Sequence, residues 1–390
     1  MLLWSIVSIL GLFGGAVGAV FYYLNDSSTL ARWIEAAAPK YVPTAWLTVD
    51  RVRLRPMSGD ITINHLKLWQ TINGRPHETL RLPWLSIKQD NQAITHGRFQ
   101  PREIVVTQPI LRLCRRTDGS WNLQGLLADP WPGEPLKTLP KVSIYNGTVE
   151  LYEEDQRASI AVLRDVVVDL IPGPGEDDLI EFRGDARGDS FERLRLEGTY
   201  ERSTQRLTLT GDLAGLGLDE TLTKRVPSEY QEWCERIRLS GGVLDVSLKK
   251  LVHDPGADMP WRYELTGHVQ NVTLNSPELP FPISELHGSI WAGDGVLSVT
   301  RLEGIHGKTT VRTWGTFDLE DLASGPMDLN VDVIDLDLDA RLRDWSPPSA
   351  PANVMLMLRE MWDQYQPKGR LSLALHAARE RQGGPVGFGL

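Results

Sequence analysis

Alternation of apolar and polar residues dominates the chain beyond about residue 45. Apolar residues recur at every second position in short stretches bounded by Gly, Pro, Asn or Asp, and this period of two is typical of strands with one buried face. The stretches are Ile61 and Ile63, Leu80 and Leu82, Val105, Leu111 and Leu113, Leu207 and Leu209, Leu244, Val246 and Leu248, and Leu371, Leu373 and Leu375. The pattern predicts a mainly β protein with a twisted antiparallel sheet that has one apolar face.

The clearest turn signal lies in residues 142–151 (VSIYNGTVEL). Asn146-Gly147 suits a two-residue type I′ turn, because both central positions of that turn need φ > 0. The resulting hairpin places Ile144 opposite Val149 and Val142 opposite Leu151, with all four side chains on one face.

Some predicted strands change phase midway. The apolar series run Ile61, Ile63, then Leu66, Leu68, and Val331, Val333, then Ile334, Leu336, Leu338. A β-bulge in each strand returns the apolar set to the same face, so the sheet is expected to be bent and twisted.

Few segments have the period of a helix. Residues 27–38 (SSTLARWIEAAA) combine a Ser cap, one apolar face and Pro39 as a stop, which predicts a short amphipathic helix near a membrane. Further candidates are residues 122–128, 219–236 and 352–365. With so few helices to cover it, the apolar face must close on itself, pack on a second sheet or hold something apolar.

The first 25 residues carry no charged side chain, and residues 2–24 (LLWSIVSILGLFGGAVGAVFYYL) are almost wholly apolar. As a helix this run spans about 35 Å, which exceeds a hydrocarbon core of about 30 Å. We therefore expect one transmembrane anchor. The alternative is a cleaved signal peptide with small residues at Ala16-Val17-Gly18, but a basic start is missing and the apolar run continues beyond that point.

A shift of 120 residues reveals an internal repeat. It aligns residues 182–184 with 302–304 and residues 209–222 with 329–342, and Gly198-Thr199 matches Gly315-Thr316 with small indels. Two diverged copies of one β-rich unit are expected. The predicted organisation is an anchor (1–25), a juxtamembrane helix (26–40), an N-terminal β module (41–162) and two β-groove repeats (163–282 and 283–390), of which the second is incomplete.

Charge and composition narrow the function. The 390 residues carry a net charge of -10 without a block of Lys and Arg, which argues against a nucleic-acid partner. Cys114 and Cys234 lie far apart and outside any CxxC motif, so only one long-range disulfide stays open. The HExxH, GxSxG, Walker A and GxGxxG motifs are missing from the sequence, so neither catalysis nor a cofactor is expected.

Two groups of polar residues were weighed as metal ligands. His268, His287 and His306 are candidates to converge on neighbouring strands, and Asp335, Asp337 and Asp339 form an acidic stripe. Both lack the ligand spacing of zinc or calcium sites, so solvent-facing positions are the preferred interpretation and no metal is predicted.

Residues 60–68 (DITINHLKL) are followed, after a paired strand, by a P-x-L-x-L-x-R strand and then D-G-x-W-N-L: Pro109, Leu111, Leu113 and Arg115, then Asp118, Gly119, Trp121, Asn122 and Leu123. Residues 142–151 come next. Together these segments resemble the N-terminal module of AsmA-like (AsmA/TamB-type) proteins.

The resemblance implies a single-pass inner-membrane protein with an elongated, taco-like β-groove in the periplasm. Such proteins are implicated in moving phospholipid between the inner and outer membranes and in outer-membrane assembly. The positive-inside rule alone places the body in the cytoplasm, because Arg32, Lys40 and Arg51 follow the anchor.

An apolar trough suits this function, because it shields acyl chains while head groups stay in water. The predicted partners are phospholipid acyl chains, the inner membrane and outer-membrane assembly proteins. The predicted groove residues are Val142, Ile144, Val149, Leu151, Leu244, Val246, Leu248, Leu371, Leu373 and Leu375. The alternatives are an envelope scaffold that recruits a partner through an exposed sheet edge, and an envelope enzyme acting on glycan.

Overall fold

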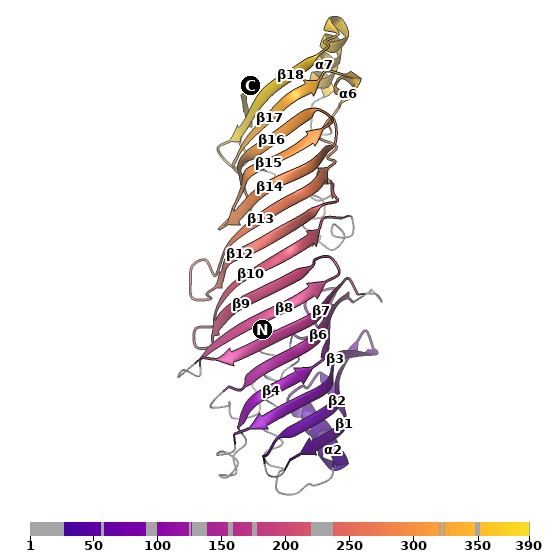
Figure 1. Ribbon diagram of the computed structural model, residues 1–390, viewed down its shortest axis with the longest axis vertical. Helices are drawn as coiled ribbons and strands as arrows, with labels where there is room; N and C mark the ends of the chain where they lie inside the picture. Colours follow the sequence, from indigo (N-terminus) through magenta and orange to yellow (C-terminus); the bar gives the residue numbers. More distant parts are fainter. Residues whose placement is uncertain are drawn as a thin grey trace. The chain divides into compact units, whose positions relative to one another are not determined.

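The protein is mainly β, as the alternation predicted. Hydrogen bonding links 19 strands of the computed structural model into one mixed, mostly antiparallel sheet, with few helices (Figure 1). The structure describes residues 27–55, 58–90, 100–124, 126, 139–154, 159–173, 178–219, 237–319, 321–322, 324–347 and 352–389. The predicted anchor lies outside these residues. Within the described part of the chain, no helix has the length and apolar character needed to cross a membrane.

The chain divides into two compact units. Unit 1 comprises Met1–Asp189, Arg193–Leu209 and Asp254–Gly256; unit 2 comprises Ser190–Glu192, Thr210–His253 and Ala257–Leu390. Unit 1 contains α2 (Ser27–Ala37), the 3₁₀ turn η1 (Ala38–Lys40), β1 (Ala45–Leu54), β2 (Ile61–Ile72), β3 (Arg75–Gln89), β4 (Pro101–Thr107), β5 (Ile110–Arg115), β6 (Lys141–Glu153), β7 (Ala161–Pro172), β8 (Leu179–Gly188) and β9 (Arg193–Glu201).

Unit 2 holds the remaining elements, apart from the first residues of β10 (Arg206–Gly217), which belong to unit 1. They are β11 (Leu239–Ser240), β12 (Val243–His253), β13 (Trp261–Leu274), β14 (Ile283–Gly293), β15 (Val296–His306), β16 (Thr309–Asp318), β17 (Met327–Asp337), α6 (Ala340–Asp344), α7 (Ala352–Tyr365), β18 (Arg370–Arg379) and β19 (Gly387–Gly389). The helix predicted over residues 352–365 is confirmed as α7. The candidate over 219–236 lies outside the described residues except for its first residue. In the candidate over 122–128, residues 122–124 form a turn and not a helix.

The predicted hairpin at Asn146-Gly147 is wrong. Residues 141–153 form one continuous strand, β6, which pairs antiparallel with β7 and parallel with both β4 and β5. Only Asn146 has a positive φ, at 54°, whereas a type I′ turn needs two such residues in succession. The single left-handed residue shifts the phase of the strand without reversing the chain.

A row of left-handed residues crosses the strands of unit 1. His65 in β2, Gln108 between β4 and β5, Asn146 in β6 and Asp165 in β7 all have φ between 51° and 54°. The pairing register places them at nearly the same level of the sheet. We call these four residues the left-handed row.

At the level of the left-handed row, successive inward-facing residues are three positions apart, whereas regular alternation spaces them by two. Inward pairs of residues flank the skip in each strand: Val49 and Val52 in β1, Ile63 and Leu66 in β2, Leu82 and Leu85 in β3, Ile144 and Gly147 in β6, Leu163 and Val166 in β7. The phase change predicted between Ile63 and Leu66 is therefore confirmed, as part of a change that neighbouring strands share.

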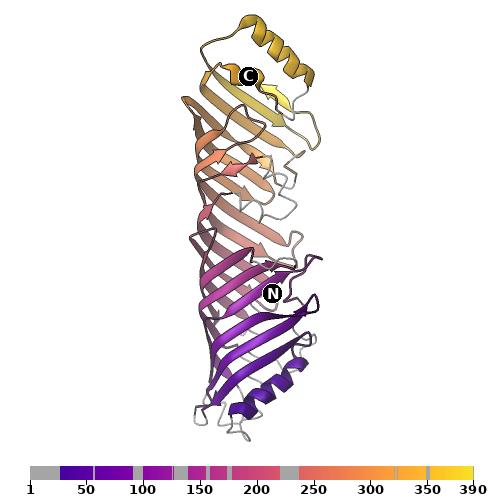
Figure 2. The ribbon, with the colours of Figure 1, turned by 90° about the vertical axis from the view of Figure 1, so that its right-hand side faces the viewer.

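The core of unit 1 lies between the sheet and α2. Helix α2 packs along β1 (Figure 2). Its Leu30 and Ile34 are buried in one cluster with Ile61, Leu66 and Leu85 of the sheet. The helix predicted over residues 27–38 is confirmed, and its apolar face packs into this core. Glu35 of the same helix accepts a hydrogen bond from the backbone N–H of Val49 at 2.7 Å, which occupies a donor of β1.

Unit 2 is an antiparallel ladder that runs in chain order from β12 to β19. The bulge predicted in the 331–338 stretch is confirmed: Asp335 has φ 57°, and the register between β17 and β18 shifts between Val333 and Leu336. A small buried cluster of Leu218, Val272, Ile283, Leu286 and Val311 fills only one part of this ladder.

Two glycines of the predicted repeat make the same close approach. A Cβ at Gly198 would lie 2.2 Å from the carbonyl oxygen of Thr208, and a Cβ at Gly315 would lie 2.1 Å from that of Asp328. Thr208 and Asp328 are themselves 120 positions apart. At both places the neighbouring strand approaches so closely that only glycine fits.

Candidate functional site

The strand register of unit 2 gathers apolar side chains on one face. Residues directly opposite each other in an antiparallel pair point to the same side, and opposite pairs such as Leu244 with Val269 and Val333 with Leu373 are apolar on both strands. The main members are Leu244, Val246, Leu248, Leu265, Val269, Ile290, Ala292, Leu297, Val299, Leu302, Val311, Phe317, Met327, Leu329, Val331, Val333, Leu371, Leu373 and Leu375. We call this set the unit 2 apolar face.

Most of this face is only half-buried. Ala292 and Val311 are buried, whereas Leu371 is 43% and Leu375 39% exposed, and most of the other members have intermediate exposure. The polar residues that share the face are few; Thr313 and Arg379 are examples. Six of the predicted groove residues, Leu244, Val246, Leu248, Leu371, Leu373 and Leu375, lie together on this surface.

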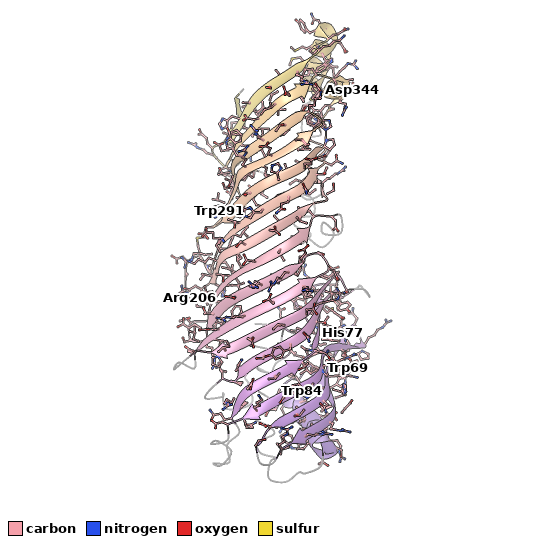
Figure 3. The ribbon with its side chains drawn as sticks, viewed as in Figure 1. Trp69, His77, Trp84, Arg206, Trp291 and Asp344 are labelled. Carbon is pink, nitrogen blue, oxygen red and sulfur yellow. The ribbon has the colours of Figure 1, made fainter. Side chains whose placement is uncertain are left out.

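The opposite face of the same strands is polar. Ser247 donates to Asp212 at 2.7 Å, and Trp291 (labelled in Figure 3) donates through Nε1 to Glu264 at 3.3 Å. Hydrogen bonds from Arg312 and then Arg301 hold the pKa of Glu303 below its usual range. The sheet of unit 2 thus has one wettable face and one apolar face.

The other four predicted groove residues lie in unit 1, in a different setting. Val142 is fully buried and Ile144 belongs to the same core cluster, while Val149 and Leu151 are partly buried against its margin. These side chains pack against protein, so in this structure Val142 has no surface to offer a ligand.

The D-G-x-W-N-L motif has a structural explanation in unit 1. Gly119 takes φ 82° in the turn, and Asp118 accepts hydrogen bonds from the side chain and backbone of Ser120, which lower the pKa of Asp118. Asn122 is fully buried: its side chain accepts from the N–H of Cys114 at 3.0 Å and donates to the carbonyl of Arg112 at 3.0 Å. The motif therefore ties the segment after β5 back onto that strand.

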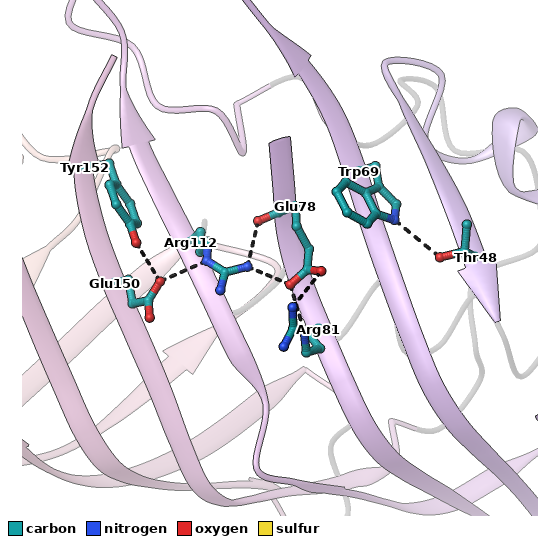
Figure 4. Close-up of polar contacts among 7 residues, drawn as sticks. All are labelled: Thr48, Trp69, Glu78, Arg81, Arg112, Glu150 and Tyr152. Atoms are coloured by element: carbon teal, nitrogen blue, oxygen red, sulfur yellow. Dashed lines mark hydrogen bonds and ion pairs between the residues drawn. The ribbon is translucent and has the colours of Figure 1, made fainter. Parts of the chain in front are cut away.

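An ionic network lies on the outward side of β3, β5 and β6 (Figure 4). Arg112 contacts Glu78 at 2.6 Å and Glu150 at 2.8 Å, Arg81 contacts Glu78 at 2.8 Å, and Tyr152 donates to Glu150 at 2.7 Å. Burial alone raises the pKa of Glu78, but the hydrogen bonds from Arg81 and Arg112 outweigh it and the net shift is downward. Burial, followed by the charge of Arg112, lowers the pKa of the adjacent His77.

This network was not predicted from the sequence. Arg81, Arg112 and Glu150 alternate with core residues of their strands, and that alternation is the signal that places them outward. Glu78 departs from it, because a register shift between β2 and β3 at Leu68 and Trp69 turns this side chain outward. Since every charge has a partner, the group is suited to holding three strands together.

The two polar groups weighed as metal ligands do not converge. His268 lies 3.0 Å from Ser289 Oγ, His287 contacts the carbonyl of Glu285, and His306 contacts that of Pro282. Asp337 pairs with Arg370, and Asp339 caps α6. Among the residues that the structure describes, no group of three or more His, Cys, Asp or Glu side chains could hold a metal ion. Cys114 is a free, buried thiol.

Comparison with known proteins adds no relative. No family model, no curated protein and no solved structure matches the chain. The resemblance to AsmA-like proteins thus rests on the segments at residues 60–68, 105–123 and 142–151.

Two other surface features were not predicted from the sequence. Trp46 and Trp69 stack at 6.5 Å on the outward side of β1 and β2, and Trp69 donates to Thr48 at 3.3 Å. Helix α7 exposes Met357, Met361 and Tyr365. The helix was predicted, but which of its sides meets solvent depends on tertiary contacts that the sequence pattern does not contain.

Proposed function

We propose that this chain is a membrane-anchored periplasmic protein that binds phospholipid acyl chains on the unit 2 apolar face. It passes lipid between the inner and outer membranes, supports outer-membrane assembly, and performs no catalytic step. The observation that carries the proposal is the continuous apolar surface from β12 to β18, most of which is partly exposed.

Such a surface calls for a covering partner. Soluble monomers rarely expose contiguous apolar patches larger than a few hundred Å². An acyl chain matches the chemistry, because each buried CH₂ contributes about 0.8 kcal/mol, so ten methylene groups contribute about 8 kcal/mol. The phosphate and its substituents need no binding pocket if they stay in water beside the strand ends.

Anchoring and compartment come from the sequence. In this proposal the apolar run of residues 2–24 anchors the chain in the inner membrane, and the resemblance to AsmA-like proteins supports a periplasmic body. Unit 1 has a well-packed core, which is closed by α2 and by Leu123 and Leu126 of the segment after β5.

Native mass spectrometry with lipid extraction tests the proposal on the full chain. Val299→Asp in β15 places a carboxylate on the apolar face, whereas Ser298→Asp places the same group one residue away on the polar face, opposite Trp291 and Thr316. The anchor recruits the same lipid in both variants, so a difference between them reports on the face alone. We expect fewer phospholipids per chain for Val299→Asp and wild-type numbers for Ser298→Asp. Equal numbers in both folded variants would contradict the proposal.

A scaffold is the second candidate, and one observation favours it. Among the described residues, β19 pairs with β18 only over His376–Ala378, so Arg370 to Leu375 have β17 as their one strand neighbour. Such an edge can accept an extended segment of an assembly partner. Ala374→Lys, which places a charge on the exposed polar side of this edge strand, should weaken capture of that partner while leaving the lipid count of the full chain unchanged.

A further inference from the structure

Helix α7 of unit 2 has its apolar side turned outward. Met357, Met361 and Tyr365 recur at intervals of four residues and therefore lie along one side of the helix, with Leu358 next to them. Tyr365 is 69% exposed, and the other three side chains are each about half exposed. We call these four residues the α7 apolar stripe.

Polar contacts hold the other side of the helix. Arg343 of α6 donates to both carboxylate oxygens of Asp363, at 2.6 and 3.1 Å, and Arg359 donates to the carbonyl of Asp344 at 3.4 Å. Met355, four residues before Arg359, is buried on this same side. The ion pair raises the pKa of Arg343 and lowers that of Asp363, so both groups stay charged over a wide pH range. These contacts fix the rotation of α7 and direct the apolar stripe away from the protein.

We propose that the α7 apolar stripe docks on the surface of a zwitterionic phospholipid bilayer and inserts its side chains at the boundary between head groups and acyl chains. The stripe offers roughly 400 Å² of exposed side-chain surface, about half of the 800 Å² per partner that a stable protein interface buries. A bilayer sets no such threshold, because insertion removes each apolar side chain from water individually.

Length and charge fit this occupant. A helix of 14 residues is about 21 Å long and so too short to span a bilayer, which leaves the interfacial position. Met and Leu adapt to irregular acyl surroundings, and a tyrosine at one end suits the head-group region. The chain carries a net charge of -10, which opposes attraction to an anionic surface and favours a zwitterionic one.

The proposal adds a membrane contact far along the chain from the predicted anchor, and it does not depend on the lipid-binding role of the unit 2 apolar face. A lipid-free apolar face would leave the docking of α7 intact, and loss of docking would leave lipid binding by the face intact. An experiment can therefore refute the docking of α7 without refuting lipid binding by the unit 2 apolar face, and the reverse.

Site-directed fluorescence tests the proposal with the full chain held in a phosphatidylcholine nanodisc. In a background without Cys114 and Cys234, an environment-sensitive nitrobenzoxadiazole probe is attached at Met361→Cys on the stripe or at Leu356→Cys as the control. Leu356 is 60% exposed but lies across the helix from the stripe, so the two sites start from similar solvation. Phosphatidylcholine vesicles are then added, with bromine-labelled acyl chains as the quencher.

We expect the vesicles to shift the Met361 probe to shorter wavelength, to protect it several-fold from aqueous iodide, and to expose it to quenching by brominated lipid, while the Leu356 probe stays unchanged. Tyr365→Asp, which charges the stripe at an exposed position, should abolish the response at Met361. An unchanged Met361 probe overturns the proposal. So does a Met361 probe that is already protected before vesicles are added and is not quenched when the nanodisc lipid itself carries the bromine label, because the stripe then packs on protein.

Discussion

Val142→Asp and Leu375→Asp place the same carboxylate on two apolar positions with opposite exposure. Val142 lies in the core of unit 1 and is 0% exposed, whereas Leu375 lies on the unit 2 apolar face and is 39% exposed. If the proposed division between a closed core and an open face is right, the first change unfolds its surroundings and the second leaves the fold intact.

The magnitudes follow from burial. Val142→Asp forfeits about 1.5–3 kcal/mol of apolar burial and leaves a carboxyl group without a hydrogen-bond partner, which costs at least about 2 kcal/mol more. A total of about 4 kcal/mol or more approaches the 5–15 kcal/mol stability of an ordinary domain. Leu375→Asp forfeits about three-fifths of a leucine's burial, about 1–2 kcal/mol, and its carboxylate reaches water.

Hydrogen–deuterium exchange of the full chain in detergent measures, peptide by peptide, how far each substitution destabilises its surroundings. For Val142→Asp we expect peptides of β6 and β7 to lose most of their protection. For Leu375→Asp we expect peptides of β17 and β18 to exchange at nearly wild-type rates, while the number of bound phospholipids falls. Val142→Ala, which leaves only a small cavity, controls for the loss of side-chain volume.

Either of two results would refute this reasoning. Wild-type protection of β6 in Val142→Asp would mean that water reaches this position and that the core of unit 1 is open. Collapse of β17 and β18 in Leu375→Asp would mean that the unit 2 apolar face is a closed core whose stability depends on each leucine.

Three further predictions concern single side chains of either unit. The pKa of His77 is lowered from 6.5, so the folded state resists protonation of this side chain, and the free energy of unfolding should fall as the pH drops below about 6.5 toward the folded-state pKa. His77→Gln should flatten this part of the pH profile in urea titrations. An unchanged slope would mean that other groups cause the pH dependence. Asn122→Ala removes two hydrogen bonds from a fully buried site and should destabilise unit 1 by about 2–4 kcal/mol in the same titrations. A loss below about 1 kcal/mol would argue against the role of Asn122 in tying the segment after β5 to that strand. Gly315→Ala should lower the melting temperature of unit 2 because its Cβ meets the carbonyl of Asp328, whereas Gly217→Ala, with its nearest neighbour 3.8 Å away, should be tolerated; equal effects would exclude the steric explanation.

The sequence predicted most strands, since period two reports directly on one-sided burial. It also located phase changes, because an apolar series that slips by one residue identifies a bulge wherever the face is kept. The hairpin failed at Asn146-Gly147 for a related reason. A left-handed Asn serves equally in a turn and in a bulge, and the choice depended on parallel pairing with β4 and β5, which lie more than 30 residues away.

Exposure was the main feature that local pattern could not supply. Val142 and Leu371 occupy identical places in an alternating strand, yet the first is fully buried and the second is 43% exposed. The difference arises because α2 and the segment after β5, with Leu123 and Leu126, cover the sheet of unit 1. Both are distant in sequence from many of the strands that they cover. The apolar positions of the candidate site were thus predictable as a set, but their division into core and open face was not.

The left-handed row sets the curvature of the sheet in unit 1. At the level of the row, strands such as β2 and β7 place two successive side chains on the outer face, Asn64 and His65 or Arg164 and Asp165, before the next inward residue. The outer face therefore carries more side chains than the inner one, which makes it the longer surface and sets the direction of bending.

That curvature resides in backbone torsions at polar, outward positions and not in the size of the inward residues. Substitutions among Val, Ile, Leu and Phe in the core of unit 1 can thus change how the core is packed without changing how far the strands bend. Core packing and sheet curvature can therefore evolve on different residues.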